Sequence, residues 1–270
     1  MARVTRFAPS PTGPLHLGHA FAALTAATRG DRFLLRIEDI DTPRCKRDWE
    51  QAIYDDLHWL GLRWEVPAMR QSDRADAYKF ALARLARDGL TYRCICTRGD
   101  IRAALSAPQE GGGLDGPIYP GICRGMGHTE GAVRLNLDAA LVQIDEAAFF
   151  ETGLRAGVHR LDKAQMRRDI GDVVLARKDI GTSYHLSVVI DDSDQGITEV
   201  TRGEDLFDAT FLHVLLQRLL GLPTPLYHHH RLIRDDQGRR LAKRDDARAL
   251  SKYREDGATP EDIRRMVFTP

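Results

Sequence analysis

The fold of this chain is decided by Arg6-Phe7-Ala8-Pro9-Ser10-Pro11-Thr12-Gly13-Pro14-Leu15-His16-Leu17-Gly18-His19. A short, partly apolar run at residues 4–8 predicts a strand, and the Ala- and Leu-rich residues 16–29 predict a helix. The prolines between them predict a rigid loop, because each proline fixes φ. In open α/β sheets ligands bind where such a strand meets such a helix, and the helix N-terminus offers free N–H groups to phosphate. The segment therefore predicts a phosphate-binding site with two histidine donors.

Alternating strands and helices continue on both sides of an interruption. We predict strands at 32–38 and 90–96, helices at 47–60 and 73–87, and further regular structure at 172–175, 184–190, 197–201 and 209–220. Residues 106–131 are rich in Gly and Pro, so no long regular element fits there. The predicted fold class is α/β, with a Rossmann-like parallel sheet and an inserted subdomain. We place the catalytic domain at 1–96 and 172–245, the insertion at 97–171 and a short C-terminal helical segment at 246–270.

Composition excludes several classes of protein. The 270 residues are 43% apolar and 29% charged, which is typical of a folded globular protein. No apolar run approaches the ~20 residues that a membrane span needs, and the N-terminus lacks the apolar core of a signal peptide. We therefore expect a cytoplasmic protein. Lys plus Arg and Asp plus Glu both number 39, which argues against a globally basic nucleic-acid binder. Residues 231–254 nevertheless hold nine Lys or Arg against four Asp, so this segment is either an RNA-phosphate contact or a solvated surface.

The usual nucleotide loops are absent from the sequence. Neither G-x-x-x-x-G-K-[ST] nor a strand-linked G-x-G-x-x-G occurs. His16 and His19 are three residues apart and lack the Glu of H-E-x-x-H, so a metal site there is a poor interpretation. An isolated H-x-G-H would most often be a capped helix start with surface histidines, but the proline-rich loop before it favours a binding role.

Four motifs in order resemble those of class I aminoacyl-tRNA synthetases in their glutamate-family form. The loop at 9–19 is similar to their HIGH motif, and Arg36-Ile37-Glu38-Asp39-Ile40-Asp41 is similar to RIEDTD. The amino-acid pocket segments resemble Thr182-Ser183-Tyr184-His185-Leu186 and Val200-Thr201-Arg202-Gly203-Glu204-Asp205. KMSKS corresponds to Arg240-Leu241-Ala242-Lys243-Arg244, where Ala242 replaces the usual Ser and Arg240 the first Lys. The resemblance covers nearly the whole chain and implies glutamate activation by ATP.

The resemblance also implies the roles of individual residues. His16 and His19 would hold the triphosphate and Lys243 the transition-state charge, usually with Mg²⁺. The implied ATP site comprises Pro9, Thr12, His16, Gly18, His19, Asp205 and Lys243.

For glutamate, Arg6 and Arg202 match the binders of the side-chain carboxylate, because a guanidinium suits a planar carboxylate. Glu38 matches the partner of the α-ammonium, and Ala8, Ser10 and Tyr184 match the pocket wall. Taken alone, Glu38 would be a helix cap or surface acid and Arg202 a turn residue.

Three of the four cysteines predict a metal site. Cys94, Cys96 and Cys123 supply three thiolates, whereas zinc takes four ligands. His128 is the generic fourth candidate. The Cys-x-Cys and Tyr-x3-Cys pattern resembles the zinc site of the glutamyl-queuosine branch of the family, which implies Tyr119 as the fourth ligand. The alternative is three unrelated cysteines, and we expect Cys45 to be a packing or an exposed residue.

The same branch implies a particular reaction. Its members activate glutamate without tRNA and attach it to queuosine at the wobble position of tRNA(Asp). The end of the chain at Pro270, shortly after the KMSKS-like segment, leads us to expect no separate anticodon-binding domain. We expect RNA contacts from residues 231–254, including Arg248 and Lys252, and from Arg167 and Arg168. A truncated glutamyl-tRNA synthetase charging the 3′ end and a non-catalytic tRNA-binding paralogue are the alternatives.

Overall fold

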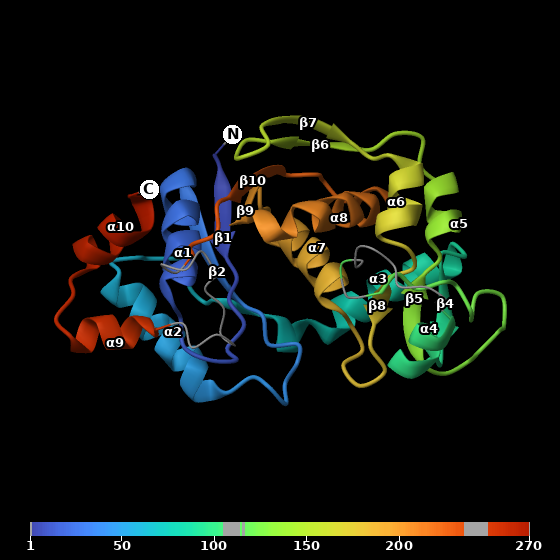
Figure 1. Cartoon of the computed structure of the whole chain (residues 1–270), viewed down its shortest axis with the longest axis horizontal. Coiled ribbons are helices and arrows are strands. Elements are labelled where there is room, and N and C mark those ends of the chain that lie inside the picture. Colours follow the sequence, from blue (N-terminus) through green and yellow to red (C-terminus); the bar gives the residue numbers. More distant parts are fainter. Residues whose placement is uncertain (1, 105–113, 115–116, 235–247, 270) are drawn as a thin grey trace.

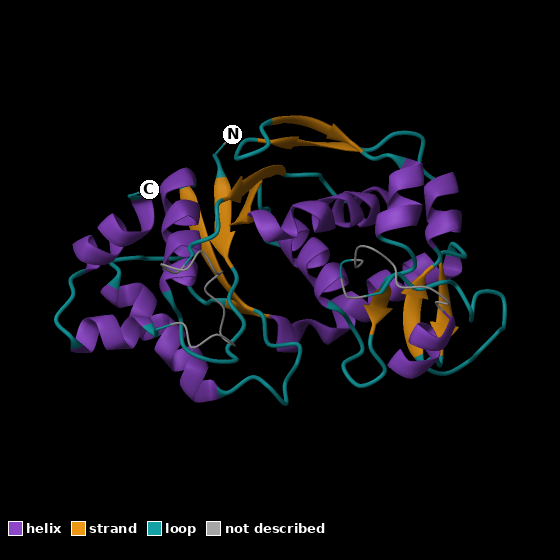
Figure 2. Cartoon of the chain, in the orientation of Figure 1, coloured by secondary structure: helices purple, strands orange, loops and turns teal. Residues whose placement is uncertain are grey.

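The structure is a computed structural model that describes residues 2–104, 114, 117–234 and 248–269. Arg240, Ala242 and Lys243 of the KMSKS-like segment lie outside the described residues. The molecule is elongated, with α1, α2, α9 and α10 at one end and α4, α5 and α6 at the other (Figure 1). Helices α7 and α8 lie between the two ends, and the strands form separate sheets along the long axis (Figure 2).

The first sheet contains the predicted strand–loop–helix junction. Its order is β1 (Val4–Phe7), β2 (Arg32–Ile37) and β3 (Met69–Arg70), and all three strands are parallel. Helix α1 (Leu17–Arg29) connects β1 to β2, and α2 (Arg47–Trp59) lies between β2 and β3. A short 3-10 turn and α3 (Ala75–Arg87) follow. The predicted helices and the buried strand at 32–38 are confirmed, to within a few residues at their ends.

The second sheet carries the other half of the site. Its order is β7 (Gly157–Arg160), β6 (Ala148–Glu151), β10 (Leu226–His230) and β9 (Glu199–Gly203), with β6 and β9 parallel to β10. Helix α7 (Tyr184–Asp194) precedes β9, and α8 (Phe207–Leu219) connects β9 to β10. The two sheets meet where the Thr198 N–H donates to the Val4 carbonyl at 3.0 Å. Loops at the carboxyl ends of β1 and β9 therefore lie close together, as a Rossmann-like fold requires.

The third sheet is antiparallel and corrects one prediction. It contains β4 (Thr91–Cys94), β5 (Ala132–Leu135) and β8 (Val174–Ala176). The strand expected at 90–96 exists, but it belongs to this small sheet and not to the parallel one. Periodicity identifies a strand without identifying its partner, which here lies about forty residues further along the chain. Helices α4 (Arg98–Ala104), α5 (Leu137–Val142) and α6 (Lys163–Asp169) surround it.

The C-terminal residues pack back onto the first sheet. Helices α9 (Leu250–Glu255) and α10 (Pro260–Phe268) insert Leu250, Ile263 and Val267 into the apolar core formed by α1, α2 and the first sheet. The Leu250 N–H donates to the Leu15 carbonyl at 2.8 Å, so the chain returns to the start of α1 after residue 248. Among the described residues, no helix is both long and apolar enough to cross a membrane.

Candidate nucleotide and amino-acid site

Two histidines cap the start of α1 and fix each other's orientation. His16 is the N-cap residue, and its Nδ1 accepts from the Gly18 N–H at 3.1 Å. The Nδ1 of His19 accepts from the His16 N–H at 3.2 Å. Because each Nδ1 is an acceptor, the proton of each neutral ring is on Nε2. Both rings therefore present an Nε2–H donor at the positive end of a helix, where phosphate binds best.

Gly18 leaves room for the capping imidazole of His16. A Cβ on Gly18 would lie 3.0 Å from Cε1 and 3.1 Å from Nδ1 of the His16 ring. A side chain there would be tightly packed against the capping imidazole, which would have to shift by a few tenths of an ångström.

The proline loop is held between β2 and the C-terminal segment. The Pro9 carbonyl accepts from the Glu38 N–H, and the Pro11 carbonyl accepts from the Lys46 N–H, both at 3.0 Å. Ala249 pairs with His16 in an isolated antiparallel bridge. Residue 249 therefore lies beside the histidine pair.

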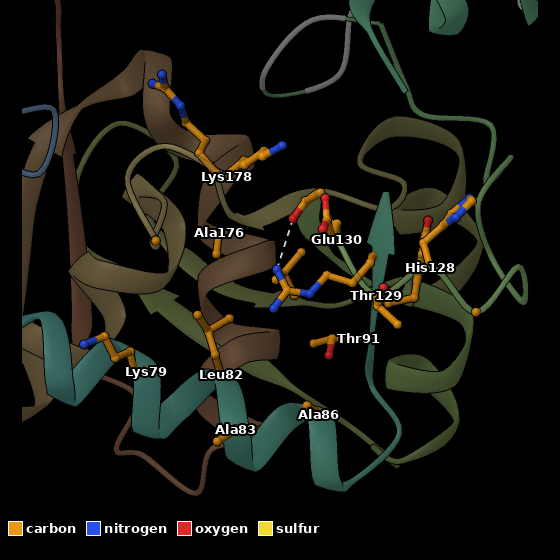
Figure 3. Close-up of a pocket in the computed structure, with 17 residues that line it drawn as sticks. Lys79, Leu82, Ala83, Ala86, Thr91, His128, Thr129, Glu130, Ala176 and Lys178 are labelled. Atoms are coloured by element: carbon orange, nitrogen blue, oxygen red, sulfur yellow. Dashed lines mark hydrogen bonds between the residues drawn. The ribbon is translucent and has the colours of Figure 1, made fainter. Parts of the chain in front are cut away.

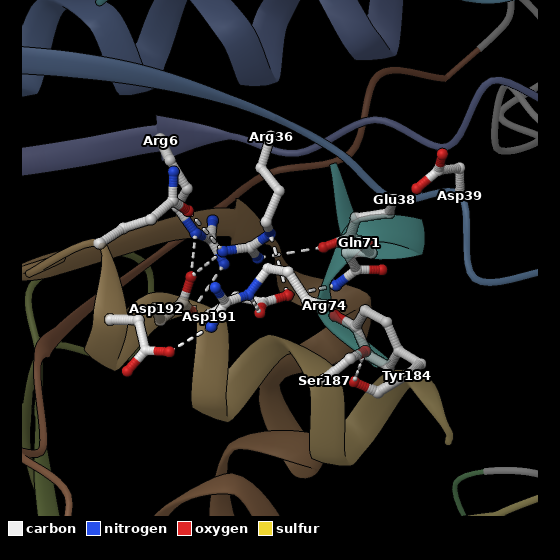
Figure 4. Close-up of polar contacts among 12 residues, drawn as sticks. Arg6, Arg36, Glu38, Asp39, Gln71, Arg74, Tyr184, Ser187, Asp191 and Asp192 are labelled. Atoms are coloured by element: carbon white, nitrogen blue, oxygen red, sulfur yellow. Dashed lines mark hydrogen bonds and ion pairs between the residues drawn. The ribbon is translucent and has the colours of Figure 1, made fainter. Parts of the chain in front are cut away.

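Arg6 and Arg36 share one buried carboxylate at the end of β1 and β2 (Figure 4). Nε of Arg6 donates to Asp192 at 2.9 Å, and NH1 of Arg36 donates to the same carboxylate at 2.7 Å. Although burial opposes ionisation, these guanidinium groups lower the pKa of Asp192 to about 2. The charge of Arg6 is thus already matched within the protein, and its NH1 donates to the Thr201 carbonyl.

A second buried acid, Asp191, stabilises the same network on the side of α3. Asp191 accepts from Gln71 at 2.8 Å, from Arg74 at 2.6 Å and from Tyr78 at 2.9 Å. These contacts hold α7 against α3 and the 3-10 turn before it, so the adjacent Asp192 is presented to the two arginines from a fixed helix.

Glu38 lies at the edge of this network with its charge only partly compensated. Its Oε1 accepts from NH2 of Arg36 at 3.1 Å. Burial raises the pKa of Glu38, and the attraction of Arg36 and Arg6 offsets the shift only in part. A cation placed beside Glu38 would therefore stabilise its carboxylate further.

Arg202 differs from Arg6 in having no acid partner. Its Nε donates to His229 at 3.2 Å, NH1 to His213 at 3.0 Å and NH2 to Thr210 at 2.7 Å. Among the residues that the structure describes, no carboxylate lies within ion-pair distance of Arg202, which is 6% exposed. Two of its five N–H donors remain after these contacts. A buried guanidinium in this state is prepared for an anion.

Tyr184 connects the two halves of the predicted pocket. Burial raises the pKa of its hydroxyl, on which the charges of Arg202, Glu38 and Arg6 all act. Ala8 and Ser10 lie in the loop after β1, as does Thr12, whose N–H donates to the Ser10 carbonyl at 2.8 Å. Asp205 lies in the turn after β9, where a Cβ on Gly203 would meet its Oδ1 at 2.4 Å. Tyr184 thus lies near Arg6, Glu38 and Arg202, between β1 and β9.

The three predicted cysteines come together with Tyr119. The Sγ atoms of Cys94, Cys96 and Cys123 all lie within 4.8 Å of one another. The Tyr119 hydroxyl is 3.3 Å from the Cys94 sulfur and 3.4 Å from the Cys96 sulfur. Burial opposes a thiolate at Cys123, but hydrogen bonds from Tyr119 and the Ile95 N–H lower its pKa to about 6. His128 is not in this group of ligand atoms in the described part of the chain.

Four of the arginines and lysines expected to contact RNA are engaged in local ion pairs. Arg167 pairs with Asp138 and Arg168 with Asp169. Arg248 pairs with Asp256, and Lys252 pairs with Glu255 at 2.6 Å. These are exposed pairs, which exchange partners at little cost.

A cavity of about 990 Å³ opens between α3 and the third sheet (Figure 3). Glu130 is one acid in its lining, whereas the basic side chains are Lys79, Arg93, His128, Arg177 and Lys178. Sequence patterns did not reveal this basic face, because its residues come from four separate segments.

Several further residues of the site also escaped the sequence analysis. They are the acids and histidines that hold the arginines, namely Glu151, Asp191, Asp192, His213 and His229. One signal was available, since two consecutive acids end the apolar run of α7, and acids in such a position are usually paired.

Comparisons with known proteins agree with this geometry. The family model described as tRNA synthetases class I (E and Q), catalytic domain, matches residues 3–269. The glutamyl-Q tRNA(Asp) synthetase of Rhodobacter capsulatus is 59% identical over 278 residues, covering 98% of this chain and 99% of that protein. The protein of the same name from Nocardia farcinica is 41% identical, covering 97% of this chain and 82% of the relative.

Solved structures show the same fold in longer chains. The glutamate-tRNA synthetase of Elizabethkingia anophelis superimposes with a TM-score of 0.75 at 24% identity. A glutamate tRNA ligase from Elizabethkingia meningosepticum, in complex with its amino acid, gives 0.74 at 25% identity. Each comparison covers 99% of this chain and 61% of the synthetase, so the chain spans about three fifths of their length. The chain therefore belongs to the class I (E and Q) tRNA synthetases, and within them to the ligases named glutamyl-Q tRNA(Asp) synthetase.

Proposed function

We propose that this enzyme activates glutamate with ATP, without tRNA, and transfers it to queuosine at the wobble position of tRNA(Asp). One observation carries the amino-acid half of this proposal, namely a buried Arg202 that has no carboxylate partner among the described residues. A dicarboxylic amino acid supplies that partner. The relatives that carry the name glutamyl-Q tRNA(Asp) synthetase support the RNA half.

The pocket fits the three charges of glutamate. The side-chain carboxylate pairs with Arg202, and Arg6 adds N–H donors while Asp192 matches its charge. The α-ammonium pairs with Glu38, whose carboxylate gains from a nearby cation. Ala8, Ser10 and Tyr184 form the wall between these two ends.

The nucleotide lies over the start of α1. Nε2–H of His16 and of His19 donate to phosphate oxygens, and Gly18 lets the base approach the backbone. Pro9, Thr12 and Asp205 complete this site. Lys243, which lies outside the described residues, would neutralise phosphate charge, and Mg²⁺ would do the same when bound.

Activation is then a displacement at the α-phosphate. A glutamate α-carboxylate oxygen attacks phosphorus, the bond to the bridging oxygen breaks, and pyrophosphate leaves with its electron pair. The protein contributes position and charge stabilisation, since no residue needs to form a covalent bond. In the second step a queuosine hydroxyl attacks the activated carbonyl, AMP leaves, and the hydroxyl proton passes to solvent or to the leaving phosphate.

The RNA approaches a surface with many cations. The predicted contacts at Arg167, Arg168, Arg248 and Lys252 are surface pairs that phosphate can displace. The basic cavity lined by Arg93 and Lys178 offers a further contact for the RNA backbone. We place the protein in the cytoplasm, where its RNA substrate is found.

The test of this proposal locates the attached label. The enzyme is incubated with ATP, labelled glutamate and tRNA(Asp) that contains or lacks queuosine. We expect label only on tRNA that contains queuosine. The label should remain on the tRNA after the 3′ ends have been removed by periodate treatment. Label at the 3′ end, independent of queuosine, would instead identify a glutamyl-tRNA synthetase, and no glutamate-dependent pyrophosphate exchange would identify a non-catalytic paralogue.

The ionisation of Glu38 gives a second test. Burial raises the pKa of Glu38, so this residue becomes protonated at a higher pH than the side chain of the substrate glutamate does. Once protonated, Glu38 no longer forms an ion pair with the α-ammonium. We expect kcat/KM for glutamate to fall as the pH falls through this raised pKa. In Glu38→Gln, kcat/KM should be lower at neutral pH. The acid limb of its pH profile should move to the lower pH at which the substrate itself is protonated. An unchanged limb in this variant would exclude Glu38 as its source.

We also propose one zinc ion per chain, held by Cys94, Cys96, Cys123 and Tyr119. Zinc–sulfur bonds of about 2.3 Å in a tetrahedron put sulfur atoms about 3.8 Å apart. The 3.5 Å between the Cys96 and Cys123 sulfurs agrees with that spacing. Zinc here would fix the loop that follows Cys123 to β4 and β5. Because this position is well away from the histidine pair, the zinc site would be structural.

Metal analysis checks this assignment directly. Chelator-washed protein should retain zinc, whereas Cys123→Ser should lose it and about 3 kcal/mol or more of unfolding free energy, because metal binding to such a site is folding energy. Cys45→Ser is the matched control, since Cys45 lies outside the group of ligand atoms. Equal metal content in wild type and Cys123→Ser would rule out this site.

A further inference from the structure

Three neutral side chains hold the Arg202 guanidinium, and we call them the Arg202 cradle: Thr210, His213 and His229. All are buried, with exposures of 0%, 2% and 1%. Their atoms accept from three different nitrogens of the guanidinium at 2.7, 3.0 and 3.2 Å. The cradle therefore fixes the plane of the guanidinium before any ligand arrives.

The hydrogen bonds determine the protonation state of both histidines. A guanidinium can only donate, so His213 Nδ1 and His229 Nε2 must be unprotonated. The proton of His213 is then on Nε2, which donates to His185 Nδ1 at 3.0 Å. The proton of His229 is on Nδ1, which donates to Glu151 at 2.5 Å. Both rings are thus neutral when they contact Arg202.

Glu151 does not neutralise Arg202 directly. The His229 ring stands between them, and Glu151 also accepts from the backbone N–H groups of His229 at 2.9 Å and Gly153 at 2.6 Å. Its charge is used to orient His229. Arg6 and Arg36 differ, because each donates directly to Asp192.

We propose that His213 and His229 are positioning residues that set the selectivity for an anionic amino-acid side chain. As neutral acceptors they fix Arg202 and leave its charge for the ligand. This inference rests on the proposed function, in which that ligand is glutamate. Glutamine would bring no charge, and its amide NH₂ would face guanidinium donors, so the cradle makes the site select by charge and not by shape.

The test compares charged and neutral replacements within the cradle. Wild type, His213→Asp and His213→Asn are titrated with glutamate, glutamine and an ATP analogue by calorimetry. We expect His213→Asp to lose glutamate affinity by about 100-fold, because the introduced carboxylate neutralises the charge of Arg202. His213→Asn keeps a neutral acceptor and should lose less than about 10-fold. The affinity for the ATP analogue should stay within about twofold in both, since His213 contacts Arg202 and His185 and neither is assigned to the ATP site.

A second pair of variants guards against failure to fold. Thr210→Asp and Thr210→Asn place the same contrast on NH2 of Arg202 and should reproduce the result. Loss of the preference for glutamate over glutamine in the Asp variants alone supports the proposal. Equal loss in Asp and Asn variants, or an unchanged preference in folded Asp variants, overturns it.

Pyrophosphate exchange separates this inference from the proposed function. If wild type binds glutamate but supports no exchange, the activation proposal fails while the binding contrast still decides the role of the cradle. If exchange occurs and the Asp and Asn variants behave alike, the cradle proposal fails and activation stands. If wild type binds neither amino acid, both proposals are overturned.

Discussion

Replacing Arg202 with methionine should reduce kcat/KM for glutamate in pyrophosphate exchange by about 1,000-fold or more, because removing one partner of a buried charge pair is that costly. Methionine keeps much of the volume but leaves the three cradle acceptors without a donor. The loss should fall mainly on KM for glutamate, with KM for ATP little changed. Steady-state exchange at saturating ATP measures it, and far-ultraviolet circular dichroism verifies folding.

Two controls define the result for Arg202. Arg160→Met removes an exposed arginine, paired with Glu146 at 3.4 Å, and should leave exchange unchanged. Arg202→Lys keeps the charge but cannot reach His213, Thr210 and His229 together, so we expect an intermediate loss. Near-normal glutamate kinetics in Arg202→Met would remove Arg202 from the pocket.

The second large effect is expected at the histidine pair. Asn places an oxygen where Nδ1 of histidine lies, and Gln places a nitrogen where Nε2 lies. His19→Asn should therefore keep the hydrogen bond from the His16 N–H but lose the donor to phosphate. We expect kcat for adenylate formation to fall by about 100- to 1,000-fold, which is the usual cost of one transition-state donor. Quenched-flow measurement of adenylate formation in a single turnover gives this rate.

His19→Gln is the matched partner of that variant. It retains a donor near the phosphate and loses the cap, so it should lose thermal stability but keep more of the rate than His19→Asn. A cap contributes about 1 kcal/mol, which is enough to be seen in unfolding. If His19→Asn were as fast as wild type, or if His19→Gln were the slower of the two, the proposed phosphate role of Nε2 would be wrong.

The start of the site could be predicted from sequence because its determinants are local. Prolines, Gly13 and two histidines three residues apart act within a single loop and the first turn of α1. The cysteine group was also predictable, since Cys94 and Cys96 are near neighbours and Tyr119 precedes Cys123 by four residues. In both cases spacing along the chain is close to spacing in the structure.

The supports of the arginines could not be predicted in this way. Asp192 lies 186 residues from Arg6, and His229 lies 78 residues from Glu151. No periodicity links residues so far apart, because the folding of β1 against β9 and of β6 against β10 brings them together. The partner of β4 was missed for the same reason. The family resemblance identifies Arg202 as a carboxylate binder, whereas the structure shows why its charge is unmatched.

One crystal structure of the enzyme with a non-hydrolysable glutamyl-adenylate mimic tests the central claim most directly. We predict its phosphate mimic at the N-terminus of α1, against His16 and His19, and its side-chain carboxylate on Arg202. A mimic bound elsewhere, or one whose carboxylate points away from Arg202, would contradict this account.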